Sequence, residues 1–155
     1  MDISLSKKDK FHQACSPGHR RAVRKCVCDK LCINTRRSDG FTCLHIASYS
    51  IRTNIVRMLL QNKAEIDLQD EKSKTALTFA SQEGHMNVIK SLLEHNANID
   101  TTDKNGVTAL MIACLNGHNH IASVLLRHNA KTDIKTIEDE TTALMLACEK
   151  VSVGA

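Results

Sequence analysis

A threonine followed by leucine two positions later and by alanine five positions later recurs four times along the chain. The spacing is 33, 33 and 34 residues, and the four residues are Thr42, Thr75, Thr108 and Thr142. A second series keeps a spacing of 33 residues, namely Asp67, Asp100 and Asp133. A period of this length predicts a tandem array of small structural units. Each unit of an array buries its apolar surface against its neighbours, so the period argues against one closed core.

The period also suggests boundaries along the 155 residues. The first ten residues are polar and are expected to form a flexible leader. The segment FHQAC at positions 11–15 matches the later LHIAS and LTFAS, which indicates a divergent first repeat. Three complete repeats and one incomplete repeat follow it. In order, the expected units are 1–10, 11–37, 38–70, 71–103, 104–137 and 138–155.

Each repeat contains the pattern of two short helices. In the central repeat, Thr75 is a suitable N-cap, and Gly84 can end the first helix in a left-handed conformation. The second helix is expected at about residues 87–95, where an apolar stripe follows helical spacing. Asn96 then supplies a second left-handed residue, because Asn tolerates this conformation well. The turn before the next repeat, at 104–106, is Lys-Asn-Gly and resembles a hairpin turn.

The repeat positions also predict which residues form the core. Leu93 and Leu126 occupy the apolar stripe of the second helix, so truncating either one to alanine is expected to cost about 2–5 kcal/mol. Cys114 and Cys148 fall in the small-residue position of the first helix and are expected to be closely packed.

The repeated segments resemble the ankyrin-repeat family, whose signature is T-P-L-H-x-A. Residues 42–47 match it at every position except the proline, and the three later copies keep its Thr, Leu and Ala. The similarity covers roughly residues 11–150. It implies an all-α solenoid of stacked helix–turn–helix pairs with projecting hairpin-like turns. It further implies a non-enzymatic scaffold or adaptor that binds another protein on the concave face.

Three positions depart from the regular repeat. Lys63 replaces a left-handed Gly or Asn, at a cost on the order of 1 kcal/mol. The inter-helix glycine is also missing at residues 50–52, so the second repeat is expected to be the least regular. One extra residue at 137–141 is expected to lengthen the last hairpin.

Eight histidines and seven cysteines raise the question of a metal site. His85 and His118 are one period apart, which places them about 10 Å apart on successive units, too far to share a metal. The cluster Cys26, Cys28 and Cys32 lacks a common zinc-finger spacing. The chain also contains no nucleophile–base–acid set and no glycine-rich phosphate loop. We therefore expect no metal, no cofactor and no enzymatic activity.

Residues that the period does not fix, at the turns and on the inner side of each first helix, are free to encode a partner. The candidate partner-binding residues are Arg37, Phe41, Tyr49, Lys74, Gln82, Val107, Leu115, Asn116 and Glu149. Four of them are apolar and are expected to be exposed in one groove, namely Phe41, Tyr49, Val107 and Leu115. Apolar anchors inside a polar rim are typical of an interface centre, although single exposed apolar residues are also common on surfaces.

A competing hypothesis concerns the basic first repeat. Residues 1–37 contain ten Lys or Arg and three acids, whereas the whole chain carries a formal charge of +4. Arg20, Arg21, Arg24 and Lys25 are expected on the outer side of a helix. They could bind phosphates of nucleic acid or an anionic membrane, act as a nuclear import signal, or simply solvate the end of the stack. Few aromatic residues and no groove-reading motif disfavour sequence-specific binding of nucleic acid.

The ends of the chain carry two further expectations. The N-terminus is too polar for a signal peptide, no apolar run could span a membrane, and seven cysteines are typical of reduced thiols. These features predict a cytoplasmic or nuclear protein. The last repeat contains a single helix, so Leu144 and Leu146 are expected to lack a polar cap. The sequence is then expected to be a fragment of a longer array, a truncated or natively short product, or a chain capped by self-association, and the truncated or natively short product is favoured.

Overall fold

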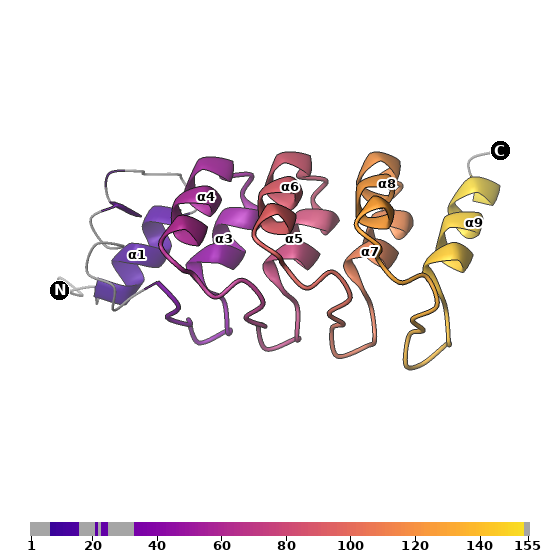
Figure 1. Cartoon of the computed structure of the whole chain (residues 1–155). Helices are drawn as coiled ribbons and strands as arrows, with labels where there is room; N and C mark the ends of the chain where they lie inside the picture. Colours follow the sequence, from indigo (N-terminus) through magenta and orange to yellow (C-terminus); the bar gives the residue numbers. More distant parts are fainter. Residues whose placement is uncertain (1–6, 16–20, 22, 25–32, 154–155) are drawn as a thin grey trace.

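The computed structural model describes residues 7–15, 21, 23–24 and 33–153, and all regular secondary structure in these ranges is helical. Helix α1 (Lys7–Cys15) lies at one end of a row of helices, and α9 (Ala143–Val153) lies at the other (Figure 1). Between them are three pairs: α3 (Cys43–Tyr49) with α4 (Thr53–Gln61), α5 (Ala76–Gln82) with α6 (Met86–Glu94), and α7 (Ala109–Leu115) with α8 (Asn119–Arg127). This is the all-α stack of helix pairs that the sequence predicts.

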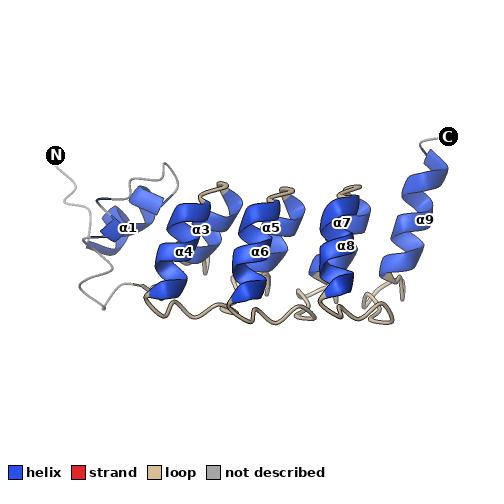
Figure 2. Ribbon diagram, turned by 45° about the horizontal axis from the view of Figure 1, so that its top comes forward, coloured by secondary structure: helices blue, strands red, loops and turns tan. Residues whose placement is uncertain are grey.

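The helices form two layers along the stack. The first helices α3, α5, α7 and α9 pack side by side, and the second helices α4, α6 and α8 pack in front of them (Figures 1 and 2). The loops that lead into each first helix project from one side of the stack (Figure 1). We call these loops the fingers and number them from the N-terminus. They comprise residues 36–41, 69–74, 102–107 and 135–141.

Neighbouring fingers are joined by one backbone hydrogen bond at each junction. In each bond an amide of one finger donates to a carbonyl of the preceding finger. The N···O distances are 3.4 Å for Glu71 to Asp39, 3.1 Å for Lys104 to Lys72 and 2.9 Å for Ile137 to Asn105. The fingers therefore form a continuous row and hold the entrances of the first helices in register.

The repeated threonines are the N-caps of the first helices. Thr75 Oγ1 accepts a hydrogen bond from the amide of Thr78 at 3.4 Å, and Thr78 Oγ1 accepts one from the amide of Thr75 at 3.3 Å. Thr42 and His45 form the same reciprocal box in α3. Such a box satisfies amides that a helix leaves unpaired at its start. The predicted N-cap at Thr75 is confirmed.

The turns after the helices use left-handed residues at the predicted places. Gly84 has φ +77°, and a Cβ there would lie 3.0 Å from the ring of His118, so both conformation and space favour glycine. Asn96 has φ +62° and Lys63 has φ +64°, as predicted. In the second repeat the glycine is replaced by Ile51, which has φ +55°. A β-branched residue in this region is strained, in agreement with an irregular second repeat.

The core consists of aliphatic side chains between the two layers. Leu59, Leu92 and Leu125 occupy equivalent positions of α4, α6 and α8, and all three are fully buried. Leu93 is half-buried against this core. The prediction that Leu126 belongs to the core is wrong, because its side chain is 46% exposed. Among the described helices, α8 is the last of the second helices, so no second helix of a following repeat covers this side chain.

The C-terminal helix α9 differs from the other first helices in its exposed apolar surface. Leu144 and Met145 are exposed, whereas Leu146 is half-buried and packs against the core. Cys114 is half-buried but Cys148 is exposed, so close packing is wrong for Cys148. Leu144 is therefore largely uncovered by the described residues, as expected, whereas Leu146 is partly covered by the core. Among the described residues, no helix is long and apolar enough to cross a membrane.

Candidate functional site

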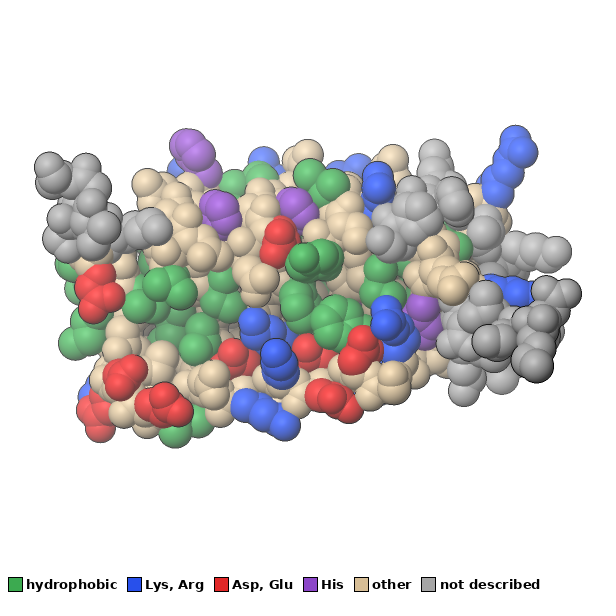
Figure 3. Space-filling model, turned by 180° about the vertical axis from the view of Figure 1, so that it is seen from behind, with side chains coloured by type: hydrophobic (Ala, Val, Ile, Leu, Met, Phe, Trp, Pro, Cys, Tyr) green, Lys and Arg blue, Asp and Glu red, His purple; other side chains and the backbone are tan. Residues whose placement is uncertain are grey.

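The fingers and the first helices line one face of the stack, which we call the inner face. Seen from behind in Figure 3, this face carries a band of hydrophobic side chains across its middle, with charged side chains gathered along the fingers below it. The inner face thus contains the apolar and polar groups from which an interface could be built.

The N-terminal half of the band is an aromatic cluster around Phe79. The ring of Phe41 lies 5.0 Å from that of Phe79, and the ring of Tyr49 meets Phe79 edge-on at 6.3 Å. These geometries are the favoured ones for aromatic pairs. Phe79 is nearly buried, so it fixes the two flanking rings rather than offering much surface itself.

Sequence reasoning missed Phe79 as the centre of this cluster. It lies four residues after Thr75, at the position that holds Ile46 and Ile112 in the neighbouring repeats. The period therefore marks it as a packing residue, which is correct. One sequence signal could have identified it. Phe79 is aromatic where the neighbouring repeats have isoleucine, and two other aromatic residues, Phe41 and Tyr49, lie on the same face.

Lys74 and Gln82 form the polar edge of the aromatic cluster. Lys74 Nζ lies 5.8 Å from the centre of the Phe79 ring and donates to Gln82 Oε1 at 3.3 Å. Gln82 in turn donates to Glu83 Oε1 at 3.0 Å. Because a cation above an aromatic face is attracted to it, the Lys74 side chain is held along the inner face. Both predicted residues, Lys74 and Gln82, therefore lie at the same place.

The structure separates the four predicted apolar anchors into two classes. Tyr49 is 50% exposed and Leu115 is 51% exposed, as expected. Phe41 and Val107 were also expected to be exposed, and this is wrong, because both are half-buried against the core. They precede the N-cap threonines, so their side chains lie against the first helices and not at the finger tips. Tyr49 and Leu115 remain as the large apolar side chains that a partner can reach.

A cleft of about 200 Å³ lies in the C-terminal half of the inner face. Its apolar walls are Val107, Met111, Leu115 and Leu146, which come from the third finger, α7 and α9. Its polar rim is formed by Asn105 and by Thr136, Glu138, Asp139 and Thr141 of the fourth finger. The cleft therefore brings the predicted residues Val107 and Leu115 together, and its other walls were not predicted.

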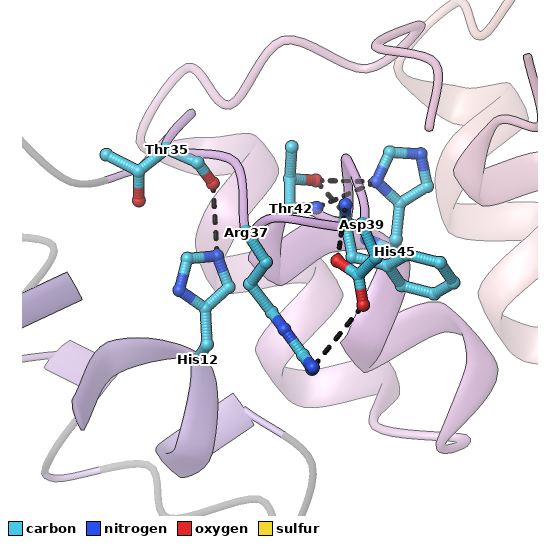
Figure 4. A network of polar contacts seen from close by, with 7 residues as sticks. His12, Thr35, Arg37, Asp39, Thr42 and His45 are labelled. Carbon is cyan, nitrogen blue, oxygen red and sulfur yellow. Dashed lines mark hydrogen bonds and ion pairs between the residues drawn. The ribbon is translucent and has the colours of Figure 1, made fainter. Parts of the chain in front are cut away.

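The remaining predicted binding residues are scattered along the inner face. Arg37 forms an ion pair with Asp39 at 3.3 Å (Figure 4). Asn116 Nδ2 donates to the backbone carbonyl of Gln82 at 3.1 Å, and Glu149 is exposed on α9. Arg37 and Asn116 thus have structural contacts in addition to any role in binding.

Figure 4 shows two buried histidines, His12 and His45, bonded to the residues on either side of the first finger, Thr35 and Thr42. His12 Nε2 donates to the carbonyl of Thr35 at 3.1 Å. His45 Nδ1 accepts from the amide of Thr42 at 3.0 Å, and its Nε2 donates to the carbonyl of Lys74 at 3.2 Å. This arrangement requires a neutral ring, because a second ring proton would point at the Thr42 amide. Burial lowers the pKa of His45 below its ordinary value of 6.5, against smaller opposing effects of the Leu68 carbonyl and Asp70.

A family model described as ankyrin repeats (3 copies) matches residues 5–70, 54–137 and 77–154. The chain belongs to the ankyrin-repeat family. A comparison with curated proteins finds no significant match. Ankyrin repeats are generally protein–protein interaction modules and are typically non-enzymatic.

In this ankyrin stack, the histidines between the paired helices bind backbone. His85 Nε2 donates to the carbonyl of Tyr49 at 2.9 Å, and His118 Nε2 donates to the carbonyl of Gln82 at 3.2 Å. Each ring therefore ties one repeat to the end of the preceding first helix. Within the part of the chain that the structure describes, no group of three or more metal-binding side chains is found. His19 and the cluster Cys26, Cys28 and Cys32 lie outside it.

The predicted basic patch lies partly outside the described residues. Arg20 and Lys25 are not described, whereas Arg21 and Arg24 are helical and exposed. Val23 between them is fully buried. This confirms the predicted orientation for these three residues, with the arginines outward and the valine inward. It leaves the binding role of the patch as a prediction.

Proposed function

We propose that this ankyrin stack binds a partner protein through its inner face, as a non-enzymatic scaffold or adaptor. The observation that carries the proposal is the exposure of two large apolar side chains, Tyr49 and Leu115, on that face. The same face carries a band of hydrophobic side chains, with charged side chains along the fingers below it (Figure 3). Clustered apolar groups within a polar rim are more typical of interaction sites than isolated ones are.

The exposed ring of Tyr49 is held in place before any partner arrives, because it packs edge-on against Phe79. Side chains that are already ordered lose less conformational entropy on binding. Tyr49 is therefore a suitable anchor in the N-terminal half of the inner face. In the C-terminal half, Leu115 forms one wall of the cleft and offers apolar contact surface.

The test is affinity purification of partners with the full chain and with Tyr49→Ala/Leu115→Ala. We expect the double variant to keep its unfolding midpoint, because both side chains are half exposed, and to lose the partners recovered by the unsubstituted chain. The matched control is Leu126→Ala, which removes an equally exposed apolar side chain from the outer layer. Partners that bind the double variant as well as the control would contradict the proposal.

A second candidate function rests on the exposed arginines Arg21 and Arg24. We propose that they contribute to binding of phosphate groups or to nuclear import, which would place the protein in the nucleus as well as the cytoplasm. Phosphate binding should weaken by orders of magnitude between about 50 and 200 mM salt. Titration with mixed-sequence DNA and with anionic lipid vesicles, using Arg21→Glu/Arg24→Glu as control, tests it. Binding that the double substitution leaves unchanged would contradict it.

A further inference from the structure

The cleft between the third and fourth fingers has no aromatic residue in its lining, unlike the N-terminal half of the inner face. In the N-terminal half, Phe79 fills the space between Phe41 and Tyr49. In the C-terminal half, the position of Phe79 holds the aliphatic Ile112, and the exposed Leu115 stands at the cleft wall. The C-terminal half therefore has room for a side chain from another molecule.

The size of the cleft limits what it can take. Its volume of about 200 Å³ is smaller than the roughly 300–1,000 Å³ typical of pockets for small molecules. It exceeds the roughly 150 Å³ apolar cavity that holds a benzene ring in an engineered protein. One large apolar side chain such as leucine, methionine or phenylalanine fits this volume. The half-buried walls Val107 and Leu146, together with the exposed Leu115, supply the apolar contacts that such a side chain needs, whereas Met111 is fully buried behind them.

The charge around the cleft indicates what flanks that side chain. Glu138 and Asp139 lie on the rim and are exposed. The neighbouring Glu140 is paired with Lys135 at 2.9 Å, whereas Glu138 and Asp139 form no ion pair with any described residue. The rim therefore carries two uncompensated negative charges, which complement lysine or arginine on a partner.

Two polar groups at the rim have hydrogen-bonding capacity left for a polypeptide backbone. Asn105 is exposed, and its side-chain amide makes no hydrogen bond within the described residues. The Thr141 hydroxyl likewise has none, since it is the Thr141 amide that donates to Thr136. A few polar groups around an apolar pocket orient a ligand. Together they suit an extended segment whose apolar side chain enters the cleft.

We propose that this cleft binds a protein segment in which a leucine, methionine or phenylalanine is flanked, within three residues, by lysine or arginine. The inference rests on the proposed partner binding at the inner face and adds the chemistry of the segment. The apolar side chain contacts Leu115 and Leu146. The basic residues lie against Glu138 and Asp139.

The experiment is selection of a phage-displayed library of random twelve-residue peptides on the immobilised full chain. We expect the enriched sequences to combine one large apolar residue with neighbouring Lys or Arg. The enriched peptides are then synthesised with a fluorescent label, and their Kd is measured by fluorescence anisotropy. We expect Leu115→Asp to weaken binding at least tenfold, because it places a charge at the apolar wall.

Charge reversal tests the rim separately. We expect Glu138→Lys/Asp139→Lys to weaken the same peptides about threefold to tenfold, as exposed charge pairs do. The matched control is Glu71→Lys/Glu94→Lys, which makes the same change in net charge at exposed acids away from the cleft and should leave Kd unchanged. Circular dichroism of each variant excludes unfolding as the cause of any loss.

The outcomes separate this inference from the proposed function. Peptides that are enriched without basic residues, or that bind Leu115→Asp with unchanged Kd, overturn the inference. If those peptides instead lose binding to Tyr49→Ala, partner binding at the inner face stands and the site lies at the aromatic cluster. If no sequence pattern is enriched, the cleft does not recognise a short segment and the inference fails.

Discussion

The central helices α5 and α6 and the C-terminal helices α8 and α9 have closely similar sequences but very different surroundings. Leu77 of α5 is 2% exposed, whereas Leu144, at the same repeat position in α9, is 70% exposed. Leu93 of α6 is half-buried, whereas its equivalent Leu126 in α8 is exposed. The residue type is the same in each pair. In a stack, the burial of an apolar side chain therefore depends on whether neighbouring helices pack against it from both sides.

The same comparison applies to the inner face. In the N-terminal half, aromatic rings pack against one another and leave Tyr49 as the exposed part. In the C-terminal half, aliphatic residues leave a cleft that the lengthened fourth finger borders with acids. The N-terminal half offers the exposed Tyr49 ring and the C-terminal half offers the cleft. A partner that contacts both would therefore bind in one orientation along the stack.

The largest expected effect separates the central core from the exposed outer layer. Leu92→Ala should lower the free energy of unfolding by about 2–5 kcal/mol, because it leaves a cavity between fully packed helices. Leu126→Ala should cost less than about 1 kcal/mol, since its side chain already contacts water. Urea denaturation followed by circular dichroism measures both. Equal losses of unfolding free energy in the two variants would contradict the difference in burial between Leu92 and Leu126.

The exposed apolar residues of α9 predict weak self-association. Leu144 and Met145 present adjacent apolar surface that a second copy of the chain could cover. Sedimentation equilibrium should show a dimer at high protein concentration, and Leu144→Asp should weaken it at least tenfold. The matched substitution Leu126→Asp on α8 should not. A chain that is monomeric at every concentration, or a dimer unaffected by Leu144→Asp, would count against this use of α9.

The buried histidine of α3 predicts a pH dependence that the neighbouring repeat lacks. The pKa of His45 is lowered in the folded protein, so below the ordinary value of 6.5 the unfolded chain binds a proton that the folded chain does not. Stability should therefore fall as the pH decreases from 7 to 5, by at most about 1.4 kcal/mol per pH unit for this group. Urea denaturation at each pH measures the slope.

The control for His45 is supplied by the next repeat, where Thr78 forms the same capping box without a titratable ring. His45→Thr should keep the cap and flatten the pH profile relative to the unsubstituted chain. An unchanged slope in His45→Thr would show that other groups cause the acid sensitivity.

The smallest effect concerns the irregular turn of the second repeat. Ile51→Gly should raise the free energy of unfolding by about 1 kcal/mol, because it removes a β-branched residue from positive φ. Lys63→Gly relieves a milder strain and should gain less. The two unfolding midpoints test the order. A loss of stability in Ile51→Gly would indicate that the Ile51 side chain contributes packing that outweighs its strain.

Much of the fold could be predicted because the same helix-capping and turn residues recur in several repeats. The N-cap at Thr75 and the left-handed residues Asn96 and Lys63 follow from short-range chemistry, and the structure confirms them. The exposure of Leu126 could not be predicted from its repeat position, because that position describes a helix with neighbours on both sides.

The candidate site was predictable only in part, for a related reason. The exposed Tyr49 and Leu115 follow from their positions at the end of a first helix. The cleft depends on residues from the third finger, α7, the fourth finger and α9 together. Its shape depends on residues that differ from one repeat to the next. The repeat pattern identifies only the residues that the repeats have in common.

The backbone ladder between the fingers has a mechanical consequence. Because a backbone bond joins each finger to the next, a displacement of one finger is transmitted to its neighbours. The first junction has in addition a bond from the Arg36 side chain to the Gln69 carbonyl at 2.7 Å, and the 2.9 Å bond from Ile137 to Asn105 joins the two fingers that border the cleft. A segment bound between the third and fourth fingers would therefore act on the whole row of fingers.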